Sequence, residues 1–153
     1  VRIPEIPTFT LLVGWTGQVA ITDSLIQVTE KKRKVETDSA FYKEFLAKSH
    51  AIVQGLQNAW NRQDIPALQE GIRSNRALLN EFAQVMQLEI ETPALQTLCD
   101  IAEQNGACAK TSGAGGGDCG ICFTQNETQR QQIETQWAKA QIQVLLLTIA
   151  EAW

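Results

Sequence analysis

The segment Lys110–Ile121, with the sequence KTSGAGGGDCGI, holds the residues best suited to contact a ligand. Five of the chain's ten glycines fall within it. Because glycine has no Cβ, consecutive backbone amides can come close to a bound anion, and the hydroxyl of Ser112 adds a donor beside them. A tight turn between two strands is the other interpretation, but such a turn needs fewer glycines. The composition of the segment therefore favours a ligand-contact loop.

Two common nucleotide-binding motifs do not fit this segment. A Walker A loop has a lysine after its last glycine, where this chain has Asp118. A fingerprint of the form G-x-G-x-x-G can be counted from Gly115, but the residues that follow predict a strand. Both motifs depend on a helix N-terminus that binds the phosphates. The loop must therefore act without such a helix behind it.

Four cysteines form the second group that could do chemistry: Cys99, Cys108, Cys119 and Cys122. Cys119 and Cys122 make a single C-x-x-C, whereas a structural zinc site uses two well-placed pairs. The single histidine of the chain, His50, is distant from them in sequence. We expect no metal site, and we interpret the cysteines as small buried thiols of a cytoplasmic protein.

Composition limits the classes of partner. The 153 residues are 44% hydrophobic and 20% charged, which is typical of a globular protein with one domain, expected over residues 1–153. The net charge of -4 gives no electrostatic reason to expect nucleic acid or an anionic membrane surface. No apolar run reaches the length that spans a bilayer. We therefore expect no nucleic-acid partner and no membrane partner.

The elements that must position the glycine loop are predicted from apolar spacing and from capping residues. Apolar β-rich segments predict four strands, at 8–15, 107–111, 119–124 and 142–149. Helical periodicity predicts about five helices, near 22–34, 39–60, 64–86, 92–106 and 127–140. The third helix has an apolar stripe that consists of Ile65, Leu68, Ile72, Leu79, Phe82 and Met86. Helices grouped between strands predict an α+β fold, with helices packed on one face of an antiparallel sheet.

The glycine segment resembles the third signature motif of the GHMP kinases, a superfamily that includes galactokinase, homoserine kinase, mevalonate kinase and phosphomevalonate kinase. Its Asp-Cys pair after the triple glycine resembles the bacterial phosphomevalonate kinases more than the other branches. Val13–Ser24 (VGWTGQVAITDS) resembles the strand-loop-helix entry of the C-terminal domain in that branch. Ile72–Phe82 (IRSNRALLNEF) is similar to the helix beneath the substrate. The resemblance spans the whole chain in the right order.

The resemblance implies the ferredoxin-like C-terminal domain of the GHMP kinase fold. It implies a mevalonate-pathway kinase that moves the γ-phosphoryl group of ATP onto the phosphate of (R)-5-phosphomevalonate, in isoprenoid biosynthesis. It also implies that the N-terminal nucleotide-binding domain is absent from this chain and would be its partner. ATP and Mg²⁺ would be bound mainly by that domain and not by this chain alone. We therefore expect no catalytic residue here and no kinase activity from the chain alone.

The same resemblance implies which residues contact the substrate. The motif loop reaches towards the substrate in the family, so Ser112, Gly113 and Ala114 are the expected contacts. Thr22 corresponds to a second hydroxyl donor, at a position where relatives often have serine. Arg76 lies at the edge of the apolar stripe, where it could bind a phosphate bidentately. An ordinary ion pair at the margin of the core explains Arg76 equally well, and the sequence leaves both roles open.

The remaining loop residues are expected to be structural. Gly115, Gly116 and Gly117 would shape the loop, and Asp118 would fix it by accepting backbone N–H bonds rather than act in catalysis. Two alternatives for the whole remain open at this point. One is another GHMP kinase, such as a mevalonate kinase, and the other is a non-catalytic ligand-binding module with the same fold.

Overall fold

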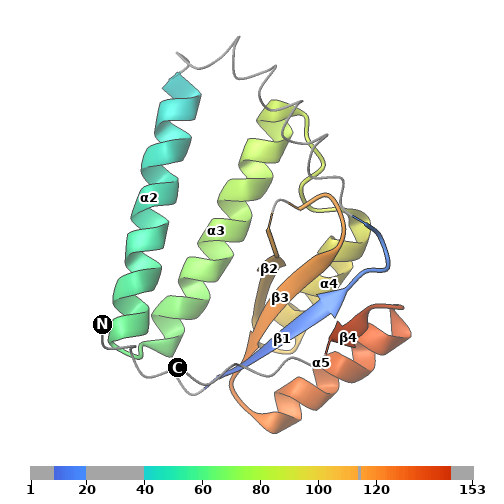
Figure 1. Ribbon diagram of the computed structural model, residues 1–153. Coiled ribbons are helices and arrows are strands. Elements are labelled where there is room, and N and C mark those ends of the chain that lie inside the picture. The colour runs from blue at the N-terminus through green and yellow to red at the C-terminus, as the bar shows by residue number, and fades with distance from the viewer. Residues whose placement is uncertain (1–8, 20–39, 114, 146–153) are drawn as a thin grey trace, which may run out of the picture.

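The computed structural model describes residues 9–19, 40–113 and 115–145 (Figure 1). In this part of the chain, four strands form one sheet and four helices lie beside it. We expected about five helices, so the helix number for the described residues is corrected to four. The other expected helix, at 22–34, lies outside the described residues.

The sheet is antiparallel throughout and has the order β2-β3-β1-β4. Along the chain, β1 comes first, three helices follow, and then β2, β3, one further helix and β4. This is the β-α-β-β-α-β arrangement of ferredoxin-like folds, so the predicted fold class is confirmed. The strands span Thr10–Trp15 (β1), Cys108–Thr111 (β2), Cys119–Thr124 (β3) and Gln143–Leu145 (β4).

Strand β1 pairs with a segment from the far end of the sequence. Its partner is β3, from Thr10 opposite Thr124 to Trp15 opposite Cys119. On its other side β1 pairs with β4, where Val13 lies opposite Leu145. The centre of the sheet therefore joins the first described residues to the last ones (Figure 1).

Capping residues begin three of the helices. Asp64 Oδ1 accepts the amide of Ala67 at 3.1 Å, and Thr92 Oγ1 accepts the amide of Leu95 at 3.4 Å. Asn126 starts the last helix in the same way. Each side chain satisfies an amide that has no partner within the first helical turn. The helices span Ala40–Asn61 (α2), Ile65–Met86 (α3), Pro93–Gln104 (α4) and Glu127–Lys139 (α5).

Helices α4 and α5 cover one face of the sheet (Figure 1). The indole N–H of Trp137, a fully buried residue of α5, donates to the carbonyl oxygen of Leu98 in α4 at 3.0 Å. This hydrogen bond satisfies the polar atom of a large side chain in the core. The core between helices and sheet consists of Leu12, Leu98, Cys99, Ala102, Ala107, Ala109, Cys122, Ile133, Trp137 and Ile142.

Helices α2 and α3 lie side by side as a long antiparallel pair, and α3 runs along the β2 edge of the sheet (Figure 1). Phe45 of α2 and Phe82 of α3 pack with ring centroids 4.4 Å apart. The expected stripe of α3 is largely confirmed, because Leu68, Phe82 and Met86 are buried, but Leu78 is buried where we expected Leu79. Because α3 packs against both α2 and β2, its buried residues cover a wider arc of the helix than a single apolar stripe.

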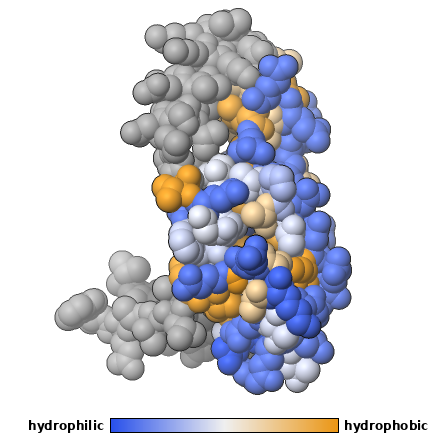
Figure 2. Space-filling view, turned by 90° about the vertical axis from the view of Figure 1, so that its right-hand side faces the viewer, coloured by the Kyte–Doolittle hydropathy of each residue, from blue (hydrophilic) through white to orange (hydrophobic). Residues whose placement is uncertain are grey.

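The side of the molecule turned towards α5 and β4 is covered mainly by hydrophilic side chains, with hydrophobic ones in small groups (Figure 2). This agrees with α5, where most residues other than Ile133 and Trp137 are polar. Among the described helices, none has both the length and the hydropathy needed to cross a membrane.

Candidate functional site

The glycine loop joins β2 to β3. The amide of Ser112 donates to the carbonyl oxygen of Cys119 at 2.9 Å, which closes the base of the loop directly after the β2–β3 ladder. Beyond this bond the backbone turns through left-handed conformations at Gly113, Gly115, Gly116, Gly117 and Asp118. Such φ values are favourable only for glycine and are tolerated by aspartate, so the sequence of the loop is required by its path.

Two neighbouring segments hold the loop. The amide of Gly116 donates to the carbonyl oxygen of Ile90 at 2.8 Å, in the connection between α3 and α4. The amide of Asp118 donates to the carbonyl oxygen of Gln18 at 2.7 Å, in the segment that follows β1. Backbone atoms from three parts of the chain therefore meet at one end of the sheet, and they fix where the loop can lie.

At one position of the loop, glycine is required because a neighbouring segment lies too close for a side chain, in addition to the backbone conformation. A Cβ built on Gly115 would overlap the carbonyl oxygen of Ile90 and lie 2.6 Å from its Cγ2. At Gly113, by contrast, no atom of the described residues lies within 4 Å of a built Cβ, and the residue is exposed. Gly115 is thus part of the packing between loop and support, whereas Gly113 is open to a molecule that approaches from outside.

Asp118 makes most of its hydrogen bonds through its main chain rather than its side chain. Its carbonyl oxygen accepts the amide of Thr16 at 2.8 Å and the Thr16 hydroxyl at 3.0 Å. Its carboxylate oxygen lies 3.6 Å from the Sγ of Cys119, within reach of the thiol proton. Asp118 therefore accepts a backbone N–H through its carbonyl oxygen, and its expected role in fixing the loop stays a prediction.

Of the five residues expected to contact the substrate, three lie within the described part of the chain. Ser112 and Gly113 lie at the start of the loop, half-buried and exposed respectively. Ala114 and Thr22 lie outside the described residues. Arg76, on α3, has carboxylate partners: its guanidinium donates to the Glu91 carboxylate and, at 3.0 Å, to Asp100 Oδ1. This is the ion pair that we had weighed against a phosphate contact.

The supports at Ile90, Glu91 and Gln18 were missed by reasoning from the sequence. Arg76 and Glu91 are 15 residues apart and belong to different elements, so no periodic pattern connects them. The only available signal was the acidic residue directly before the cap at Thr92, on a segment that must turn between two helices.

The cysteines do not form a site. Cys119 and Cys122 point to opposite faces of β3, as their odd spacing predicted, and all four cysteines are free thiols. Cys99, Cys108 and Cys122 are buried, which raises the pKa of Cys99 to about 12 and that of Cys108 to about 11. Protonated, buried thiols are poor nucleophiles and poor metal ligands. Within the described ranges, no three histidine, cysteine, aspartate or glutamate side chains are placed to hold a metal ion.

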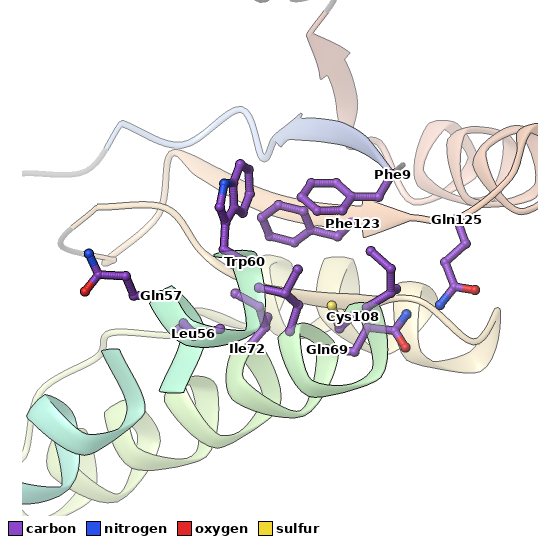
Figure 3. A pocket seen from close by; sticks show the side chains of 11 residues that line it. Phe9, Leu56, Gln57, Trp60, Gln69, Ile72, Cys108, Phe123 and Gln125 are labelled. Atoms are coloured by element: carbon purple, nitrogen blue, oxygen red, sulfur yellow. The ribbon is translucent and has the colours of Figure 1, made fainter. Parts of the chain in front are cut away.

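An apolar pocket lies at the opposite end of the β2–β3 ladder from the glycine loop, where α2 ends and α3 begins (Figure 3). It has a volume of about 290 Å³, and its aromatic side chains include Phe9 and Phe123, with ring centroids 4.9 Å apart. The residues that line it are Phe9, Leu56, Gln57, Trp60, Ile65, Leu68, Gln69, Ile72, Cys108, Phe123 and Gln125. Because none is charged, the pocket does not suit a phosphorylated substrate, and the glycine loop is the better candidate.

Comparison with known proteins identifies the family. A family model described as "GHMP kinases C terminal" matches residues 52–143, more than half of the chain. The chain belongs to the GHMP kinases. The matched region contains α3, α4, β2, β3, α5 and the whole glycine loop.

Similar proteins of known sequence or structure agree with this family. The chain is 38% identical over 151 residues to a phosphomevalonate kinase from Streptomyces sp. (strain CL190), covering 97% of this chain and 40% of that protein. A crystal structure of the Lin0012 protein from Listeria innocua has a TM-score of 0.86 at 32% identity, covering 95% of this chain and 39% of the other.

A phosphomevalonate kinase from Streptococcus pneumoniae, in complex with phosphomevalonate and AMPPNP, has a TM-score of 0.77 at 29% identity. That match covers 90% of this chain and 38% of the other. The GHMP kinase chain described here thus spans about two fifths of the length of the relatives that it matches.

Proposed function

We propose that this chain is the C-terminal, substrate-contacting part of an ATP-dependent phosphomevalonate kinase. The observation that carries the proposal is the glycine loop between β2 and β3, which has backbone amides and the Ser112 hydroxyl at one end of the sheet. Hydrogen bonds to the carbonyl oxygens of Ile90 and Gln18 fix its path. The 38% identity to a phosphomevalonate kinase over 97% of the chain supports the choice of branch within the family. The reaction would yield diphosphomevalonate and ADP.

In this proposal the loop contacts the phosphorylated substrate with main-chain amides and hydroxyl groups. We assign this role to Gly113, Ala114 and Thr22 and to the hydroxyl group of Ser112, since the amide of Ser112 already donates to Cys119. Neutral donors of this kind bind an anion without an added positive charge, because several N–H dipoles converge on it. The contribution of the loop is to position the phosphate that receives the γ-phosphoryl group, since phosphoryl transfer depends mainly on positioning and electrostatics.

ATP and Mg²⁺ are assigned to parts of the enzyme outside this chain. Within the described residues, no three histidine, cysteine, aspartate or glutamate side chains are placed to share a metal ion, and the Glu91 carboxylate is paired with Arg76. We derive no step of the reaction through the metal or the nucleotide from these residues. The N-terminal nucleotide-binding domain would be the partner that supplies them. Four free thiols further support a cytoplasmic protein.

A coupled assay of ADP release tests the function. The full-length protein, supplied with Mg-ATP and phosphomevalonate, should turn over, and the 153-residue chain alone should show no turnover. Calorimetric titration of the full-length protein with mevalonate and with its 5-phosphate tests the substrate. Tighter binding of the unphosphorylated alcohol would exclude a phosphomevalonate kinase and favour a mevalonate kinase, and an absence of turnover with either would favour a ligand-binding module.

A further inference from the structure

The connection between α3 and α4 has contacts on both of its sides. On one side, Ile90 accepts the amide of Gly116 at 2.8 Å, and its backbone is the surface against which Gly115 packs. On the other side, the next residue, Glu91, accepts hydrogen bonds from Arg76 and from another α3 side chain. Two adjacent residues therefore link α3 to the glycine loop.

The carboxylate of Glu91 is held by more than a surface ion pair. Its side chain is only 8% exposed, and that of Arg76 is 18% exposed. Arg76 Nε donates to Oε2 at 2.9 Å, Nη2 donates to Oε1, and Asn80 Nδ2 donates to Oε2 at 3.1 Å. Burial of a carboxylate is unfavourable without such partners, so removal of either charge would displace the segment that carries it.

Two of the three guanidinium nitrogens of Arg76, Nε and Nη2, donate hydrogen bonds in this arrangement. Besides the three hydrogen bonds that the guanidinium donates to Glu91, its Nη2 lies 3.0 Å from Asp100 Oδ1. The hydrogen bonds to Glu91 raise the pKa of Arg76 above its already high ordinary value, so the charge is permanent. To bind a phosphate bidentately, the guanidinium would have to release Nη2 from Glu91 and Asp100, which would leave the nearly buried Glu91 carboxylate with fewer partners. A bidentate contact between Arg76 and the substrate is therefore disfavoured.

We propose that Arg76 and Glu91 are positioning residues of the glycine loop. Their ion pair fixes Glu91 and its neighbour Ile90 against α3, and the Ile90 carbonyl then fixes Gly116 and the loop that begins at Ser112. The mechanical link stands without the proposed function, whereas its effect on phosphomevalonate binding rests on that function. The proposal replaces the direct phosphate contact that the sequence had left open for Arg76.

The first experiment measures hydrogen–deuterium exchange of the peptide covering residues 112–118 in the full-length protein without ligands. We expect the Glu91→Ala variant to exchange about tenfold faster in this peptide, and Arg76→Lys to lie between it and the parent. The matched control is Glu103→Ala, which breaks the 2.8 Å ion pair between Arg73 and Glu103. That pair joins α3 to α4, whereas Arg76–Glu91 joins α3 to the connection between them. Because the side chain of Arg73 donates to Glu103 and to the Ala107 carbonyl, exchange in the loop should stay unchanged.

The second experiment measures binding of phosphomevalonate to the same variants by calorimetry. If the pair positions the loop, Glu91→Ala weakens binding about tenfold, because the loop contacts are misplaced. If Arg76 instead binds the phosphate, loss of Glu91 frees the guanidinium, and binding tightens. The two roles therefore predict changes of opposite sign for one substitution.

If Glu91→Ala fails to fold, Glu91→Gln serves as the second variant, because it keeps the side-chain volume and one acceptor oxygen. It should show the same two changes with smaller size. Unchanged loop exchange in Glu91→Ala and Glu91→Gln, or equally fast exchange in Glu103→Ala, overturns the positioning role. If the unaltered protein does not bind phosphomevalonate, the proposed function fails, and the exchange measurement still decides whether the ion pair holds the loop.

Discussion

Gly14 and Gly120 lie directly opposite each other on β1 and β3, and the side chain of Leu98 occupies the space that their missing side chains leave. A Cβ built on Gly120 would lie 2.6 Å from Leu98 Cδ2, and one built on Gly14 would lie 2.8 Å from Leu98 Cδ1. The two glycines thus form a notch in the sheet into which α4 packs.

We expect Gly120→Ala to lower the free energy of unfolding by about 1–3 kcal/mol, because the added methyl group overpacks this notch. A second substitution, Leu98→Ala, should cost less in the Gly120→Ala background than in the parent, since it makes room for that methyl group. Urea denaturation measures both changes. Gly55→Ala is the control: Gly55 is an exposed residue of α2 with nothing within 4 Å of a built Cβ, so the change should stabilise by about 0.5–1 kcal/mol.

Among substitutions in the glycine loop, the loss of stability should be larger where the new side chain meets more steric overlap. Gly113→Ala introduces only an unfavourable left-handed backbone, which costs about 1–2 kcal/mol. Gly115→Ala adds the overlap with Ile90, and we expect a total loss of about 2–5 kcal/mol. Thermal unfolding of the two variants tests this order. Equal losses would mean that the loop can move away from Ile90 without cost.

Stability should fall with rising pH in the alkaline range. Burial raises the pKa values of Cys99 and Cys108 to about 12 and about 11, and it raises that of Cys122 as well. Above about pH 8.5 the unfolded chain releases protons that the folded chain retains, so the free energy of unfolding decreases. Each thiol contributes up to about 1.4 kcal/mol per pH unit until its folded pKa is reached.

Urea denaturation between pH 7 and pH 10.5 measures this decrease. The Cys99→Ala variant should be less stable at pH 7 and should lose stability less steeply above pH 8.5. A slope that is the same in the variant and the parent would show that Cys99 does not contribute to it.

Thiol labelling should single out Cys119, the one cysteine that is not fully buried. Partial burial and the neighbouring Asp118 carboxylate raise the pKa of Cys119, so labelling by a disulfide reagent should be slow at pH 7 and accelerate above pH 9. Asp118→Asn removes the negative charge and should shift this acceleration to lower pH. Mass spectrometry of the labelled peptides identifies the modified residue.

The sequence was sufficient for the elements whose signals are local. The helices expected near 64–86 and 92–106 begin at the caps Asp64 and Thr92, because capping depends only on the first turn. The antiparallel α+β layers followed from the order of helices and strands. The role of glycine as a residue for left-handed turns was equally local, and the loop adopts such turns.

Contacts between distant segments could not be predicted in the same way. The loop is supported by Ile90 and Gln18 through backbone carbonyl groups, which every residue type possesses, so side-chain identity has no signal for them. For Arg76, two roles stayed open with equal weight, because a guanidinium at the edge of a stripe suits a phosphate and a carboxylate alike. Only the position of Glu91 distinguishes between them.

The pairing of β1 with β3 has a consequence for synthesis of the protein. Thr124 follows Thr10 by 114 residues, so β1 has emerged from the ribosome long before its central neighbour exists. At roughly 5–20 residues per second, the nascent strand waits on the order of ten seconds with its apolar face uncovered. During translation, helices such as α2 and α3 can already form from local contacts, whereas completion of the sheet is delayed until β4 has been synthesised.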